Sequence, residues 1–141
     1  MVVLIDTNVI IDALTYREPF MQNAKAILNK CRNGEIIGYI AAYTVPTIFY
    51  ILQKHFSVSE RRDMLSKLCR FIDVAGISKQ HVINAIENEH FNDLEDCLQM
   101  ECAASIGADY IVTRNTDDFS GSTIPTVLPG EFLVKLEAVY G

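Results

Sequence analysis

The stretch VVLIDTNVII, residues 2–11, places a carboxylate and two small polar residues directly behind an unbroken apolar run. Val2 to Ile5 shows no alternation of polar and apolar side chains, which is typical of a strand buried on both faces of a parallel sheet. We expect this strand over residues 2–6, followed by a short helix from Val9 to Leu14. A carboxylate behind a buried strand is costly without a partner, so Asp6 is the first candidate for a ligand-binding residue.

Segments of strand and helix type alternate along the rest of the chain. Apolar runs predict further strands at 36–42, 71–76, 109–113 and 125–129. Amphipathic helical patterns lie between these runs, and a last helix is expected around 131–139. This order is typical of a parallel sheet covered by helices on both faces.

Capping residues mark the starts of several predicted helices. Ser57 and Glu60 have the spacing of a capping box, and Asp93 is a suitable N-cap for the helix that follows it. Thr44 is expected to cap the helix after the second strand, which places Thr47 at the third helical position.

Length and composition favour a single domain, residues 1–141, with one core. Half of the residues are hydrophobic and 21% are charged, and no apolar run is long enough to span a membrane. The four cysteines lack the spacing of a zinc site, so we expect free thiols in a reducing cytoplasm. The formal charge of −6 argues against strong nonspecific attraction to nucleic acid, although acids gathered at a metal site would also make a nucleic-acid enzyme acidic.

Acidic residues from three distant segments are expected at one edge of the sheet. Asp6 ends the first strand, Asp117 and Asp118 follow the fourth, and Asp93 and Asp96 begin the helix that leads into it. In parallel α/β sheets, ligands bind beyond the carboxyl ends of the strands. Converging carboxylates repel one another, and a hard cation such as Mg²⁺ or Mn²⁺ neutralises them. Such a cation can activate water and hold a phosphodiester for in-line attack.

Each of these acids also has a purely structural explanation. Asp93 can cap its helix, and Glu95 and Asp96 can interact favourably with the N-terminal helix dipole. For any single acid the structural explanation is the stronger one, whereas the convergence of all three segments favours a metal site.

Three segments, IDTNVIIDAL (5–14), DLEDCLQMECA (93–103) and IVTRNTDDF (111–119), resemble in this order the PIN-domain ribonucleases, especially VapC-type toxins of bacterial toxin–antitoxin pairs. The similarity extends to the closing PTVLPGEFL (125–133). It implies a Rossmann-like, three-layer α/β/α sandwich with a central parallel sheet of about five strands. It also implies Mg²⁺- or Mn²⁺-dependent cleavage of RNA phosphodiester bonds, an antitoxin partner and a homodimer.

The resemblance assigns roles to individual residues. Asp6, Asp96 and Asp118 match the metal-binding, catalytic acids of the family. Other residues match polar positions beside these acids or lie next to them in the sequence: Asn8, Asp93, Thr113, Asn115 and Asp117. Arg114, which follows the fourth strand, is a candidate for contacting an RNA phosphate, or equally for a surface ion pair with Asp117 or Asp118.

Thr47 departs from the family pattern. The family usually has Glu or Asp in the first turn of the helix after the second strand, where this chain reads YTVPTIFYIL (43–52). A threonine offers a neutral hydroxyl and one negative charge fewer. The alternative to an active nuclease is therefore a PIN-fold binding module with weakened or absent catalysis. A phosphatase with a nucleophilic aspartate is disfavoured, because Asn8 stands where those enzymes have a second aspartate.

Overall fold

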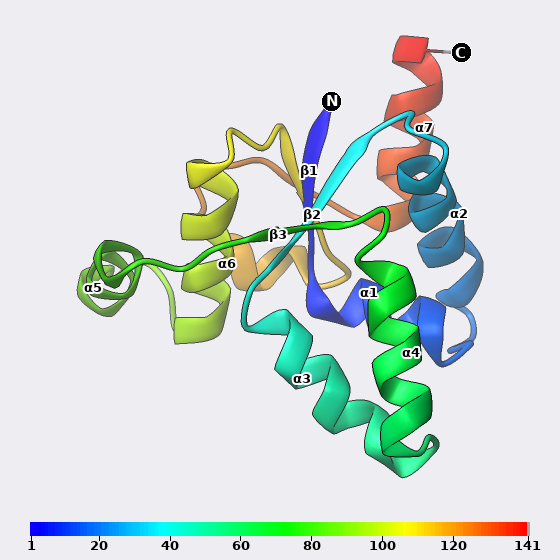
Figure 1. The fold of residues 1–141 in the computed structure, drawn as a ribbon. Coiled ribbons are helices and arrows are strands. Elements are labelled where there is room, and N and C mark those ends of the chain that lie inside the picture. The colour runs from blue at the N-terminus through cyan, green and yellow to red at the C-terminus, as the bar shows by residue number, and fades with distance from the viewer. Residues whose placement is uncertain (141) are drawn as a thin grey trace.

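The computed structural model describes residues 1–140. Figure 1 shows a central sheet with helices packed on both of its sides. In chain order the elements of this range are β1 (Val2–Ile5), α1 (Thr7–Leu14), α2 (Met21–Arg32), β2 (Ile37–Ala41), α3 (Thr44–Ile51), η1 (Leu52–Lys54), α4 (Val58–Leu68), β3 (Asp73–Ala75), α5 (Lys79–Glu87), α6 (Leu94–Ser105), β4 (Tyr110–Val112), η2 (Thr116–Phe119), β5 (Thr126–Val127) and α7 (Pro129–Tyr140). Each strand lies inside its predicted range, so the strand predictions are confirmed.

The sheet has the strand order β3-β2-β1-β4-β5, and every neighbouring pair is parallel. In the central strand, Val3 is in register with Gly38 of β2 and with Tyr110 of β4. The chain leaves β1 towards β2 on one side and later returns to β4 on the other side (Figure 1). This reversal creates a topological switch point at the carboxyl end of β1, the place where open α/β sheets bind ligands. Asp6 is the residue at that point.

Two helical layers cover the sheet and bury both of its faces. Successive residues of a strand face opposite sides: Ile5 packs into the core formed with α1, α2, α3, α4 and α7, whereas Leu4 packs with α5 and α6. Val112 and Ile111 of β4 divide in the same way. This double burial explains why β1 reads as an uninterrupted apolar run, and it confirms the three-layer α/β/α sandwich with a parallel sheet.

The start of α3 differs from the prediction. The helix begins at Thr44, and its N-cap residue is Tyr43, which makes no side-chain capping bond. Thr44 is fully buried, and its hydroxyl lies 2.9 Å from the hydroxyl of Thr7 at the start of α1. The Thr44 side chain thus contacts α1 instead of capping its own helix. Because α3 begins at Thr44, Thr47 is the fourth helical residue.

The other predicted caps are present. Ser57 Oγ accepts a hydrogen bond from the Glu60 backbone N–H at 3.1 Å, and the Glu60 carboxylate accepts one from the Ser57 N–H at 3.0 Å. Asp93 accepts a hydrogen bond from the Asp96 N–H at 3.2 Å. Local sequence signals are thus sufficient to place the starts of α4 and α6.

All four cysteines are free thiols. Cys31, Cys97 and Cys102 are buried, whereas Cys69 is exposed. Over residues 1–140, none of the helices combines the length and the apolar character that crossing a membrane requires.

Candidate active site

A polar cleft of about 320 Å³ lies at the carboxyl end of β1. Its walls come from the starts of α1, α3 and α6 and from the segment after β4. It is lined by seven of the ten residues that the sequence points to: Asp6, Asn8, Thr47, Asp93, Asp96, Asn115 and Asp118. The remaining three, Thr113, Arg114 and Asp117, do not line it. The fold therefore brings the three acidic segments to one place.

Asp6 is a buried member of this cleft, with 7% of its surface exposed. Its Oδ2 accepts a hydrogen bond from the Thr113 hydroxyl at 2.8 Å, and its Oδ1 accepts one from Gln99 Nε2 at 3.1 Å. Although Asp6 occupies the N-cap position of α1, its side chain makes no capping bond there. The carboxylate is therefore held by β4 and α6 instead of by its own helix.

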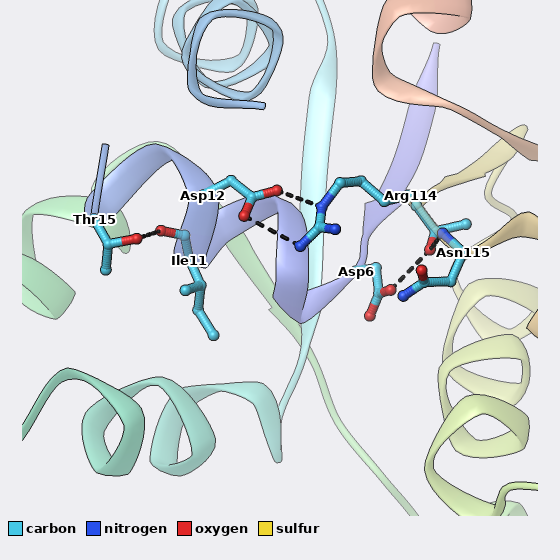
Figure 2. Close-up of polar contacts among 7 residues, drawn as sticks. Asp6, Ile11, Asp12, Thr15, Arg114 and Asn115 are labelled. Atoms are coloured by element: carbon cyan, nitrogen blue, oxygen red, sulfur yellow. Dashed lines mark hydrogen bonds and ion pairs between the residues drawn. The ribbon is translucent and has the colours of Figure 1, made fainter. Parts of the chain in front are cut away.

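Thr113 and Asn115 extend this hydrogen-bond network. Thr113 is fully buried, and while its hydroxyl donates to Asp6 it accepts from the Asn115 backbone N–H at 3.0 Å. Figure 2 shows Asn115 close to Asp6 at the end of β4. Thr113 thus supports Asp6 from below the cleft surface, whereas Asn115 lines the cleft itself.

The first turn of α6 supplies further acids to the cleft. Asp93 caps the helix through the Asp96 N–H, so its structural explanation holds even though it also lines the cleft. Asp96 is half-buried. The Tyr43 hydroxyl donates to the Glu95 carbonyl at 2.8 Å, which ties the start of α3 to the start of α6. The two walls are therefore braced against each other.

Burial and mutual repulsion favour the protonated forms of two cleft acids. Burial raises the pKa of Asp6; hydrogen bonds and the positive charge of Arg114 oppose this increase, and the charge of Asp118 adds to it. The pKa of Asp96 is raised to about 7. Burial is the largest cause, and the negative charges of Asp93, Asp6 and Asp118 add to it. A positive ligand in the cleft would relieve both effects.

Thr47 lines the cleft on the side of α3. Its hydroxyl donates to the Tyr43 backbone carbonyl at 2.9 Å, so that proton is already used within the helix. Only the lone pairs of this oxygen remain for a ligand. The α3 wall is therefore neutral at the position where the family pattern has an acid.

Arg114 pairs with a different acid from those suggested by the sequence. Its Nε and Nη2 lie 2.6 Å and 3.3 Å from the two carboxylate oxygens of Asp12 in α1 (Figure 2). Asp12 is 1% exposed, and the Arg114 guanidinium carbon lies 4.1 Å from the centroid of the Phe20 ring. The pairing with Asp117 or Asp118 is not formed, because a bidentate bond to a buried carboxylate is stronger than one to an exposed acid.

Gln99 is a cleft residue that the sequence reasoning missed. It lies one turn after Asp96 on α6, lines the cleft and donates to Asp6. The signal available in the sequence is a polar amide three residues after a candidate acid, within an otherwise mostly apolar helical stretch. That spacing places both side chains on one helix face.

The oxygen atoms of the cleft suit a hard divalent cation. Carboxylate, hydroxyl and amide oxygens are the donors that Mg²⁺ and Mn²⁺ prefer. Among residues 1–140, no three His, Cys, Asp or Glu side chains are already grouped so that they could hold a metal ion. Mg²⁺ usually keeps several waters and binds directly to only one or two carboxylates, so a hydrated ion fits this looser arrangement. Gln99 Oε1, which is buried without a hydrogen-bond partner in the described chain, adds an unused oxygen.

A comparison with protein-family models matches residues 2–117 to the PIN domain. The chain belongs to the PIN domain family. The matched range contains most of the cleft residues, and Asp118 follows it directly. This match confirms the family that the sequence motifs predict.

Several solved structures share the fold of this PIN domain. A toxin–antitoxin complex from Klebsiella pneumoniae is 22% identical at a TM-score of 0.67, covering 90% of this chain and 97% of that one. VapBC-1 from nontypeable Haemophilus influenzae is 14% identical at a TM-score of 0.68, covering 92% and 99%. VapBC2 from Rickettsia felis, bound to a DNA fragment from their promoter, is 14% identical at a TM-score of 0.66, covering 91% and 98%. The TM-scores over nine tenths of both chains establish a shared fold at these low identities. The search of curated proteins found no match.

Proposed function

We propose that this PIN domain is a Mg²⁺- or Mn²⁺-dependent endoribonuclease, and that it acts in the cytoplasm as the toxin of a toxin–antitoxin pair. The observation that carries the proposal is the common cleft of Asp6, Asp96 and Asp118, which come from three distant segments. Nuclease activity is general in the PIN domain family, and the shared fold with toxin–antitoxin complexes supports the toxin role.

The roles of the residues follow from their positions. Asp6, Asp96 and Asp118 are the proposed ligands of the hydrated divalent cation, directly or through its waters, and hydrogen bonds hold Asp6 in place without the ion. When bound, the cation supplies an activated water and neutralises charge at the phosphodiester. Asn8 and Asn115 line the same cleft and have side-chain N–H groups suited to phosphate oxygens.

An antitoxin protein and a second copy of the chain are the proposed partners. Tyr16 and Tyr50 are strongly exposed and Phe20 is partly exposed, and exposed aromatic side chains are enriched at protein interfaces. Expression of the protein without its antitoxin should arrest bacterial growth, and Asp6→Asn should relieve the arrest. Normal growth with wild-type protein accumulating in the cell would contradict the toxin role.

Thr47 favours a second candidate, a PIN-fold binding module without catalysis. The neutral α3 wall removes one negative charge from the cleft, which weakens the attraction for a divalent cation. Such a protein would keep the fold and the partner surfaces but leave RNA intact.

A nuclease assay distinguishes the two candidates. We expect purified protein to cleave single-stranded or structured RNA with Mn²⁺ or Mg²⁺. EDTA should stop cleavage, and so should Asp6→Asn, which removes the charge of a proposed cation ligand. Asp63→Asn is the matched control, because Asp63 is an exposed acid of α4 that pairs with Lys67 on the surface. Intact RNA at high protein concentration with either metal would contradict the nuclease and favour the binding module.

A further inference from the structure

Gln99 has a buried side-chain amide of which one end is hydrogen-bonded and the other end is not. The residue is 1% exposed, and its Nε2 donates to Asp6 Oδ1 at 3.1 Å. Its Oε1 is buried and has no hydrogen-bond partner within residues 1–140. Because buried polar atoms are nearly always hydrogen-bonded, this oxygen requires an explanation.

The packing around Gln99 within α6 does not require an amide. Met100 and Ala103, its neighbours on α6, are buried in the apolar core on that side of the sheet. An apolar side chain of similar size would fill this space without leaving an unpartnered oxygen. The hydrogen bond that the amide makes goes instead to Asp6, on another element, and Gln99 lines the cleft beside it.

The donors on Asp6 come from two directions. Thr113 of the β4 end donates to Oδ2, and Gln99 of α6 donates to Oδ1. Two donors on different oxygens fix the plane of a carboxylate, whereas a single donor leaves it free to rotate. Each oxygen has a further lone pair for a ligand.

We propose that Gln99 is a positioning residue that fixes the plane of Asp6 for a hydrated divalent cation and offers Oε1 as an acceptor to the hydration shell of that cation. The inference rests on the proposed function, since it takes Asp6 as a cation ligand. Mg²⁺ usually retains several waters when proteins bind it, and water is the kind of donor that Oε1 lacks. A role in ligand binding therefore accounts for the hydrogen bond that Nε2 donates to Asp6 and for the unpartnered Oε1.

Calorimetric titration of the full chain with MnCl₂ tests this role without measuring activity. Gln99→Met keeps the length of the side chain and removes the amide. We expect it to weaken Mn²⁺ binding by about 10- to 100-fold, the range found for groups that orient metal ligands. Gln80→Met is the matched control, because Gln80 carries an exposed amide on α5 that donates to Asn84, and its Mn²⁺ affinity should equal that of the wild type.

Circular dichroism shows whether Gln99→Met is folded. If it is not, Gln99→Asn decides by the same criterion, because it keeps a polar amide but is one methylene too short to reach Asp6. Wild-type affinity in the folded variant would overturn the role of Gln99 and leave the metal site standing. A wild-type protein that binds no Mn²⁺ would overturn the metal site and the role of Gln99 together, so the wild-type titration separates the two failures.

Discussion

Asp6 has hydrogen-bond donors on both carboxylate oxygens and still has a raised pKa. The donors favour the charged form, burial opposes it, and the effect of burial is the larger one. The fold thus holds a carboxylate in a fixed orientation without fully stabilising its charge. A residue in this condition is prepared for a positive ligand.

Asp96 contributes to the pH dependence of the stability of the metal-free protein. Its pKa is about 7 in the fold against an ordinary value of 3.8, so between these values the folded protein binds more protons than the unfolded chain. Its contribution to stability is therefore greatest at low pH and is lost as the pH rises through about 7. Thermal melts in EDTA should show a melting temperature that falls between about pH 4 and about pH 7 and levels off above that range, with a less steep fall in Asp96→Asn. An equal slope in this variant would contradict the assignment.

We expect a substitution at Thr47 to strengthen cation binding. Thr47→Glu adds a carboxylate to the neutral α3 wall of the cleft, and the number of ligand charges tunes cation affinity. We expect calorimetry to show Mn²⁺ binding about tenfold tighter than in the wild type, and RNA cleavage at lower Mn²⁺ concentration. Thr47→Ser keeps the hydroxyl that donates to Tyr43 and should match the wild type. Unchanged affinity in a folded Thr47→Glu would show that this position does not act on the ion.

The Asp12–Arg114 ion pair connects α1 to the segment after β4. Removing one member of a buried pair leaves an uncompensated charge, which typically costs 3–5 kcal/mol. Because Asp12 is almost fully buried, Arg114→Met should lower the free energy of unfolding in urea by about 3 kcal/mol. The double variant Asp12→Leu/Arg114→Met should recover most of this loss. If Arg114→Met were as stable as the wild type, it would contradict the claim that Asp12 becomes an uncompensated buried charge.

Arg61 connects α4 to the end of α3. Its Nη1 donates to the Phe49 carbonyl at 2.9 Å and its Nε to the Phe56 carbonyl at 3.2 Å. Arg61→Ala should lower the free energy of unfolding by about 2 kcal/mol, since hydrogen bonds to charged groups are strong. The exposed Arg62 is the control, and Arg62→Ala should change stability by less than about 0.5 kcal/mol. Equal effects of the two substitutions would show that the carbonyl contacts do not matter.

How much of the whole structure can be predicted from the sequence depends on the range of the interactions that form it. Strands and most caps depend on neighbouring residues, so the order of the elements could be predicted. The convergence of the acids could be expected for a different reason: the carboxyl ends of parallel strands lie at one edge of the sheet, whatever the order of the strands. The position of Thr44 inside α3 could not be predicted, because its hydrogen-bond partner Thr7 is 37 residues away in the sequence. The pairing of Arg114 with Asp12 spans 102 residues, and the hydrogen bond from Gln99 to Asp6 spans 93. Contacts of this length depend on strand order, which no local pattern specifies.

The charge of the molecule also constrains its function. The chain has a formal charge of −6, and acids line the cleft at the sheet edge. An RNA phosphate that approaches this edge is repelled unless a cation lies between the two. The cation site is therefore the central requirement of the proposed activity.

Anomalous diffraction from a crystal soaked in MnCl₂ tests that requirement most directly. We predict a manganese peak in the cleft, bounded by the carboxylates of Asp6, Asp96 and Asp118 and about 2.1 Å from the nearest carboxylate oxygen, the distance of hard-cation coordination. A cleft without a peak at saturating Mn²⁺, or manganese bound only elsewhere on the protein, would contradict the proposal.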